Sequence, residues 1–159
     1  MHLRVKDLMS AQPHACAVSE PASAAARIMW EHDCGIVPVV SGDGRLVGVV
    51  TDRDICMATY LQGRPPAEIP VRQLMTREPI ACHPDDEVLW AEHLMAERQI
   101  HRLPVVDHHG APVGMLSLGD LARGSTASGD GRRKGDLRDD LLQTMAAIAR
   151  PRVQSPLPH

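Results

Sequence analysis

The alternation of apolar and polar positions predicts short strands that alternate with helices. Residues His14–Val18 form an extended segment, and Ser19-Glu20-Pro21 marks the start of a helix, because proline is tolerated in a first helical turn. The apolar residues that follow recur at helical spacing and predict one buried face, made of Ala22, Ala25, Ala26 and Met29.

A β-hairpin and a second helix come next. Ile36–Val40 and Leu46–Val50 are short, apolar and rich in β-branched residues, and the turn sequence Ser41-Gly42-Asp43-Gly44 separates them. A helix is predicted from Thr51 to about Tyr60. The order is therefore β-α-β-β-α, which places the fold in the α+β or α/β class.

The same unit occurs again 66 residues further along the chain. Without a gap, Val5–Ile55 aligns with Val71–Leu121, and Pro38-Val39-Val40 matches Pro104-Val105-Val106. The second copy is predicted to have its elements at Asp86–Arg98, Leu103–Val106 and Val113–Leu116. Two copies, fewer than a solenoid needs, predict a pseudo-twofold pair that buries one shared face.

The repeat also sets the expected organisation of the chain. It predicts a first domain at 3–62, a linker at 63–70, a second domain at 71–123 and a tail at 124–159. Residues 124–135 are rich in glycine, serine and charge, and are predicted to be a flexible linker. A helix is predicted at 136–150, because four apolar residues keep helical spacing there: Leu137, Leu141, Met145 and Ile148.

Composition narrows the classes of function. A net charge of -3 and an aromatic content of 2% argue against nucleic-acid binding, which needs a clustered basic surface or stacking platforms. No apolar run is long enough to span a bilayer and the N-terminus lacks an apolar signal core, so a cytoplasmic location is expected. The cysteines show no CxxC spacing and are predicted to be reduced and unpaired: Cys16, Cys34, Cys56 and Cys82.

Two segments, 48–54 and 114–120, carry the candidate chemistry where a strand turns into a helix. Both read glycine, two apolar residues, Thr or Ser, two further residues and Asp. One interpretation is a capping box, in which side chains satisfy the free amides of a helix start. The other is a ligand site, since a helix N-terminus binds phosphate and a carboxylate accepts hydrogen bonds from ribose hydroxyls. The use of Asp in both copies, and a glycine that admits a close neighbour, favour the ligand site.

These features together resemble the CBS-domain proteins. The resemblance rests on the duplicated unit, on the run from Gly48 to Ile55 and on Ile100–Asp107, and it covers residues 1–121. It implies a Bateman module, a tandem CBS pair with two clefts, that binds AMP, ADP, ATP or S-adenosylmethionine. It also implies a regulatory protein that is not an enzyme and requires no cofactor. Because no target domain is fused to the pair, an unknown effector protein is expected to be regulated in trans.

Each cleft is expected to combine residues of both copies. In the first cleft, Asp54 would hold the ribose, Thr51 the ribose or phosphate, and Val49 would face the base. The second copy would close this cleft with Ile80, Ala81, Cys82, Ile100 and His101. In the second cleft the same roles fall to Asp120, Ser117 and Met115, with His14, Ala15, Cys16, Cys34 and Gly35 opposite. Arg53 and Arg102 have no basic counterpart at the equivalent positions, so phosphate is expected to bind better in the first cleft.

The alternative function is a stress or interaction protein that binds no nucleotide and has vestigial clefts, or a metal or redox sensor that uses Cys and His. His93, Glu97 and His101 are spaced by four, which could place metal ligands on one helix face. Because Ile100 is expected to begin the next strand, His101 is predicted to leave the helix, which favours an exposed helix face. Cys16 and Cys82 fall at equivalent strand positions and are expected to be small buried hydrophobes.

A homodimer is also expected. The helices carry apolar residues that one module cannot wholly cover, among them Ile55, Met57 and Leu121. The tail helix could add to this contact through Leu137, Leu141 and Met145.

Overall fold

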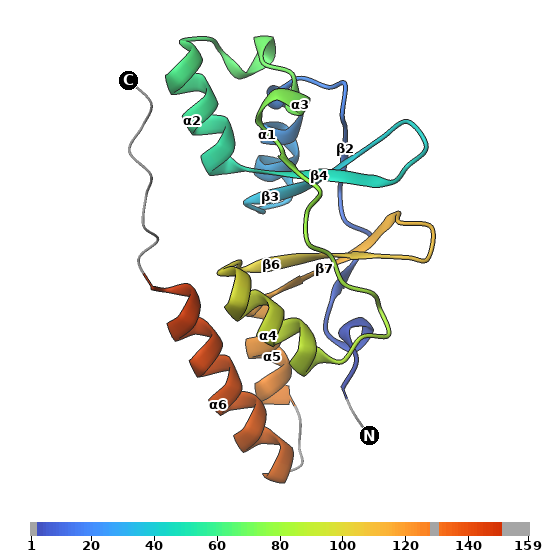
Figure 1. Cartoon of the computed structure of the whole chain (residues 1–159), viewed down its shortest axis with the longest axis vertical. Helices are drawn as coiled ribbons and strands as arrows, with labels where there is room; N and C mark the ends of the chain where they lie inside the picture. Colours follow the sequence, from blue (N-terminus) through green and yellow to red (C-terminus); the bar gives the residue numbers. More distant parts are fainter. Residues whose placement is uncertain (1–2, 128–130, 151–159) are drawn as a thin grey trace.

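The structure, a computed structural model, describes residues 3–127 and 131–150. Two sheets lie next to each other in the middle of the molecule, and helices lie beyond each of them (Figure 1). The first sheet has the order β2-β3-β4-β5, with β2 at Cys16–Ala17, β3 at Ile36–Val40, β4 at Leu46–Thr51 and β5 at Thr76–Arg77. The second has the order β1-β7-β6, with β1 at Ser10–Ala11, β7 at Pro112–Ser117 and β6 at Arg102–Val106.

The helices confirm the predicted β-α-β-β-α order in both copies. They are α1 at Ala22–Glu31, α2 at Asp52–Gln62, α3 at Val71–Leu74, α4 at Val88–Arg98, α5 at Leu118–Ala127 and α6 at Gly131–Ile148. Two 3-10 helices complete the described elements, η1 at Val5–Asp7 and η2 at Pro66–Glu68. Both hairpins have an irregular register at the same place, between Val39 and Val40 and between Val105 and Val106, so the two copies fold alike.

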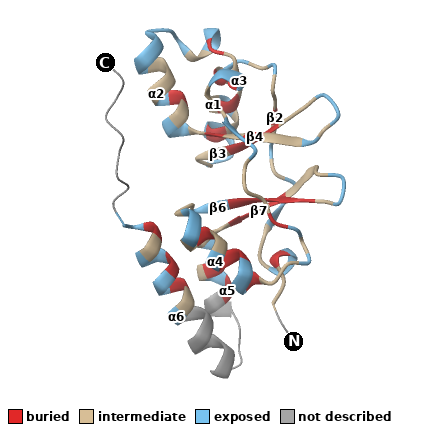
Figure 2. Cartoon of the chain, viewed as in Figure 1, coloured by how far each residue is buried: buried red, intermediate tan, exposed pale blue. Residues whose placement is uncertain are grey.

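Buried hydrophobic residues form two clusters, one for each copy, where the sequence predicted one shared face. Figure 2 shows the buried positions on the paired strands and on the helix sides that face them. The first cluster contains Val37, Val39 and Val50, and the second contains Leu103, Val105 and Leu116. The paired strands of each hairpin therefore form the floor of a separate small core.

Each core is completed by a segment that precedes the other copy of the repeat in the sequence. Val5 is fully buried in the second core, and its amide donates to the Asp86 carbonyl at 2.9 Å. Ile69 is fully buried in the first core, and its carbonyl accepts from the Ala22 amide at 2.8 Å. The predicted linker 63–70 thus contributes Ile69 to the first core, and the exchanged segments tie the two halves together.

The tail differs from the prediction of a flexible linker at 124–135. Helix α5 continues through Ala127 and α6 already begins at Gly131, before the predicted start at residue 136; residues 128–130 lie outside the described part. The glycine at 124 has a packing role, because a Cβ there would lie 2.6 Å from Leu8 Cδ2.

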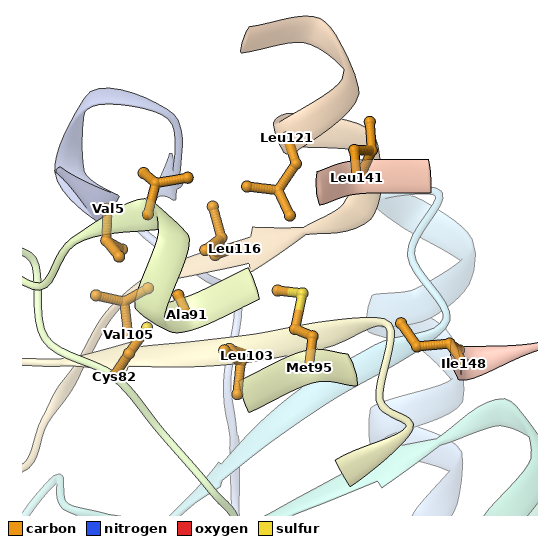
Figure 3. Packing of buried hydrophobic residues seen from close by; sticks show 11 residues of the cluster. Val5, Cys82, Ala91, Met95, Leu103, Val105, Leu116, Leu121, Leu141 and Ile148 are labelled. Atoms are coloured by element: carbon orange, nitrogen blue, oxygen red, sulfur yellow. The ribbon is translucent and has the colours of Figure 1, made fainter. Parts of the chain in front are cut away.

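Helix α6 covers the second core. Leu141 and Ile148 are buried within that cluster, close to Leu121 and Met95 respectively (Figure 3). The Gln99 side chain, at the end of α4, donates from Nε2 to the Ala147 carbonyl at 3.1 Å. The C-terminal helix is therefore an integral part of the second half.

Of the apolar residues predicted for a dimer contact, Met145 is exposed, whereas three others face a core. Leu121 is fully buried, and Ile55 and Leu141 are nearly so. The large exposed hydrophobic side chains are Trp30, Tyr60, Leu61, Leu89, Trp90, Leu142 and Met145. Within residues 3–127 and 131–150, no helix is both long and apolar enough to cross a membrane.

Candidate functional site

The first motif, at the start of α2, has the geometry of a capping box. Thr51 is the N-cap residue, and its hydroxyl accepts from the Asp54 amide at 3.1 Å. Asp54 Oδ2 in return accepts from the Thr51 amide at 2.9 Å and from the Thr51 hydroxyl at 2.8 Å. Among the described residues, no donor reaches Asp54 Oδ1. The capping interpretation is therefore correct for one carboxylate oxygen, and the other remains open to a ligand.

The second motif, at the start of α5, repeats the cap but has no open oxygen. Asp120 Oδ2 accepts from the Ser117 amide at 2.8 Å and from the Ser117 hydroxyl at 2.6 Å. Its Oδ1 accepts from Arg123 Nη2 and, at 3.5 Å, from the Ser10 hydroxyl. With 5% of its surface exposed, Asp120 is nearly enclosed. The two carboxylates thus differ in their availability to a ligand.

Arg123 and Ser10 make this difference, and neither was among the predicted site residues. The repeat places Met57 at the position equivalent to Arg123, and methionine cannot donate a hydrogen bond. A comparison of the copies along the whole of each helix would have revealed the Arg123 difference. The role of Ser10 could not have been read there, because it depends on β1 lying beside β7.

The glycine of each motif admits a close neighbour, and that neighbour belongs to the chain itself. A Cβ on Gly48 would lie 2.6 Å from Met75 Sδ and 2.9 Å from the Thr76 carbonyl oxygen. A Cβ on Gly114 would meet Met9 Sδ at 2.5 Å and the Ser10 carbonyl oxygen at 3.1 Å. The close neighbour at each glycine is the exchanged chain segment, β5 or β1, that completes the sheet.

Arg102 joins the two copies. Its Nη1 lies 3.8 Å from the position of a Cβ on Gly35, and Asp52 Oδ2 lies 3.3 Å from the same point. Arg102 begins β6 of the second copy, whereas Asp52 begins α2 of the first, so an exposed guanidinium reaches the helix start that carries Thr51 and Asp54. Gly35 was predicted to line the second cleft, the one with Asp120. Arg102 was predicted for the first cleft, so it lies between the residues predicted for the two clefts.

Two histidines stack next to the second group. The His14 and His32 rings have centroids 3.4 Å apart and planes inclined by 6°. His32, the C-cap residue of α1, was not predicted as a site residue. His101 and Arg53 are exposed, and a further set is half-buried: Val49, Ile80, Ala81, Ile100, Ala15, Cys34 and Met115.

The thiols of Cys16 and Cys82 face the cores, as expected of small buried hydrophobes. Their side chains are 1% and 0% exposed, and burial raises the pKa of Cys16 to about 11 and that of Cys82 to about 12. Neither sulfur can line a cleft in this arrangement, although both residues were among those predicted to do so. Cys34 lines a hollow between α1 and α2 instead.

A thiol titration tests this placement. Exposed Cys56 should react quickly with a disulfide reagent at pH 8, whereas Cys16 and Cys82 should react only after unfolding, because the thiolate is the reactive form. All four cysteines should titrate in denaturant without a reductant. Rapid modification of the folded Cys16→Ser, Cys34→Ser, Cys56→Ser variant, in which Cys82 alone remains, would contradict the burial of Cys82.

The proposed metal arrangement on α4 is not formed. The helix ends at Arg98, and Gln99 adopts a left-handed conformation with φ of 51°, so His101 leaves the helix as predicted. Throughout the described residues, no group of three His, Cys, Asp or Glu side chains is placed to hold a metal ion.

Comparison with known proteins identifies the repeat. The sequence matches the CBS domain at residues 5–60 and again at 71–126. The chain belongs to the CBS-domain family. The CBS domain-containing protein YhcV of Bacillus subtilis is 41% identical over 118 residues, which are 74% of this chain and 82% of YhcV.

Solved CBS pairs have the same fold. The CBS domain pair of protein MJ0100, in complex with 5'-methylthioadenosine and S-adenosyl-L-methionine, has a TM-score of 0.69 and 29% identity, covering 77% of this chain and 95% of that one. CBSX2 in complex with AMP has a TM-score of 0.67 and 27% identity, covering 77% and 96%. The tandem CBS pair predicted from the sequence is thereby confirmed.

Proposed function

We propose that this CBS pair is a regulatory module, not an enzyme, that binds an adenosine-type ligand at the start of α2. The open Oδ1 of Asp54 carries the proposal, because a carboxylate oxygen without a donor can accept from a ribose hydroxyl. Two related CBS pairs hold ligands of this kind: AMP in one, and 5'-methylthioadenosine with S-adenosyl-L-methionine in the other.

Arg102 favours a ligand with a phosphate. It brings a guanidinium to the start of α2, where the helix dipole also attracts an anion. The first amides of the helix are already occupied, because those of Asp52, Arg53 and Asp54 donate to the Gly35 carbonyl, the Asp52 carboxylate and the Thr51 hydroxyl. At the start of α5, by contrast, Arg123 already pairs with Asp120. We therefore assign the nucleotide to the Asp54 side, in agreement with the unequal clefts expected from the sequence.

Titration calorimetry with AMP tests the assignment through two matched variants. Asp54→Asn should weaken AMP binding by roughly ten- to a hundredfold, the worth of one charge-assisted hydrogen bond. Asp120→Asn, the equivalent change in the second copy, should leave the affinity nearly unchanged. Circular dichroism must show both variants folded, because both lose a capping carboxylate.

A third variant separates phosphate from ribose recognition. Wild type should bind AMP more tightly than adenosine, and Arg102→Ala should remove that advantage while leaving adenosine binding intact. The assignment is wrong if Asp120→Asn is the damaging change, or if neither AMP nor S-adenosylmethionine binds to the wild type.

We further propose that the module acts in the cytoplasm as a homodimer and regulates a separate effector protein. The exposed Trp30, Tyr60 and Leu61 on the first copy support an association surface. The alternative of a metal or redox sensor that uses Cys and His is not proposed. Cys16 and Cys82 are buried in apolar cores, and no group of three His, Cys, Asp or Glu side chains among the described residues is placed to hold a metal ion.

A further inference from the structure

The surface between α1 and α2 has a hollow of about 450 Å³ that no described part of the chain fills. Met29 and Ile55 form part of its lining, and Cys56 and Trp30 lie at its surface. Trp30 is 89% exposed, which is unusual for so large an apolar side chain on a monomer surface. We call this surface the α1–α2 groove.

The internal repeat shows what kind of object fits there. A shift of 66 residues places Met29 on Met95 and Ile55 on Leu121, and both of these are fully buried in the second copy. Helix α6 covers that face with Leu141 and Ile148. The same face of the same folded unit therefore carries an amphipathic helix in one copy and none in the other.

Helix α6 has a second apolar edge that the fold does not use. Leu142 and Met145 are 63% and 48% exposed and lie three residues apart, so they project from neighbouring turns on one side. Leu141, the residue before them, faces the core. The helix can thus contact its own α4 and α5 and a second surface at the same time.

The arrangement of the helices allows two copies to pair reciprocally. In Figure 1, α2 and α6 lie along the same edge of the molecule, α2 in the first half and α6 in the second. A twofold axis beside this edge brings α6 of each copy against α2 of the other. Such an interface is closed and self-complementary, as is usual for homodimers.

We propose that α6 of one copy docks in the α1–α2 groove of a second copy, with Leu142 and Met145 beside Trp30 and Cys56, and that the contact is made twice. The proposal rests on the homodimer proposed above and gives it a geometry. It also assigns the C-terminal helix a second role, since α6 completes the second core and covers the partner's groove.

Disulfide trapping tests the geometry, because Cys56 is a natural probe in the groove. Met145→Cys should give a disulfide-linked dimer under mild oxidation, seen on a non-reducing gel. Adding Cys56→Ser should abolish it. The wild type should give no linked dimer. Its two Cys56 residues would lie apart, because α2 of one copy would not face α2 of the other.

Light scattering with two matched tryptophan variants tests the surface. Trp30→Glu should weaken dimerisation by roughly tenfold or more, because aromatic residues at the centre of an interface contribute strongly. Trp90→Glu changes an exposed tryptophan of α4, outside the groove, and should remain a dimer.

The outcomes separate this geometry from the other proposals. A wild-type monomer at all concentrations would overturn the homodimer and the docking together. A dimer that survives Trp30→Glu, or that links through Cys56 in the wild type, would overturn only the docking of α6. AMP binding is a separate readout. If the wild-type protein does not bind AMP, only the proposed ligand is overturned, and the proposed dimer is not affected.

Discussion

Glu92→Leu is expected to raise the free energy of unfolding by about 3 kcal/mol at pH 8.5. The Glu92 side chain on α4 is fully buried beneath α6, and among the described residues neither of its carboxylate oxygens has a hydrogen-bond partner. Burial, together with the nearby charge of Asp140, raises its pKa from 4.5 to about 7. Leucine removes a buried group that must otherwise be ionised at alkaline pH.

The sign of the pH dependence follows from that raised pKa. Between pH 4.5 and about 7 the folded protein keeps the Glu92 proton that the unfolded chain releases. The stability that the folded protein gains by keeping this proton is therefore fully present below pH 4.5, and it is lost as the pH rises through 7. Urea unfolding should show a stability gap between Glu92→Leu and wild type that is small at pH 4.5 and full by pH 8.5.

Glu97→Leu is the control, because Glu97 lies on the same helix and is exposed. Its stability should follow the wild-type pH dependence. If the stability of Glu92→Leu also runs parallel to that of the wild type from pH 4.5 to 8.5, the structure is contradicted, because it buries Glu92 without a hydrogen-bond partner among the described residues.

Gly48→Ala is expected to lower the free energy of unfolding by about 2 kcal/mol, a cost typical of overpacking. Its added methyl would lie 2.9 Å from the Thr76 carbonyl oxygen, and this backbone atom can move away only if β5 leaves β4. Met75 can change its rotamer, whereas the backbone cannot. Thermal and urea unfolding measure the loss.

Gly42→Ala is the matched control, since nothing lies within 4 Å of a Cβ at that turn position. Its effect should stay within about 0.5 kcal/mol, as for ordinary surface changes. A Gly48→Ala variant as stable as the wild type would contradict the close approach of β5 to Gly48.

The sequence was sufficient for the repeated unit, the order of its elements and the location of the two motifs. These properties are local: the helix of Ala22, Ala25 and Met29 and the hairpin around Gly44 each depend on residues close together in the chain. The cap between Thr51 and Asp54 spans three residues and was visible for the same reason. The internal repeat indicated that two such units pair, and the family resemblance added the class of ligand.

Only the tertiary structure decided which segments far apart in the chain meet. Ser10 reaches Asp120 across 110 positions of sequence, and Gly124 accommodates Leu8 from the opposite end of the chain. The exchange of Val5 and Ile69 between cores likewise joins segments far apart in sequence. Such contacts depend on where the folded elements meet and leave no periodic pattern along the chain. The long-range contact of Ser10, together with the local pairing of Arg123, occupies the carboxylate oxygen of Asp120 whose counterpart on Asp54 has no donor among the described residues.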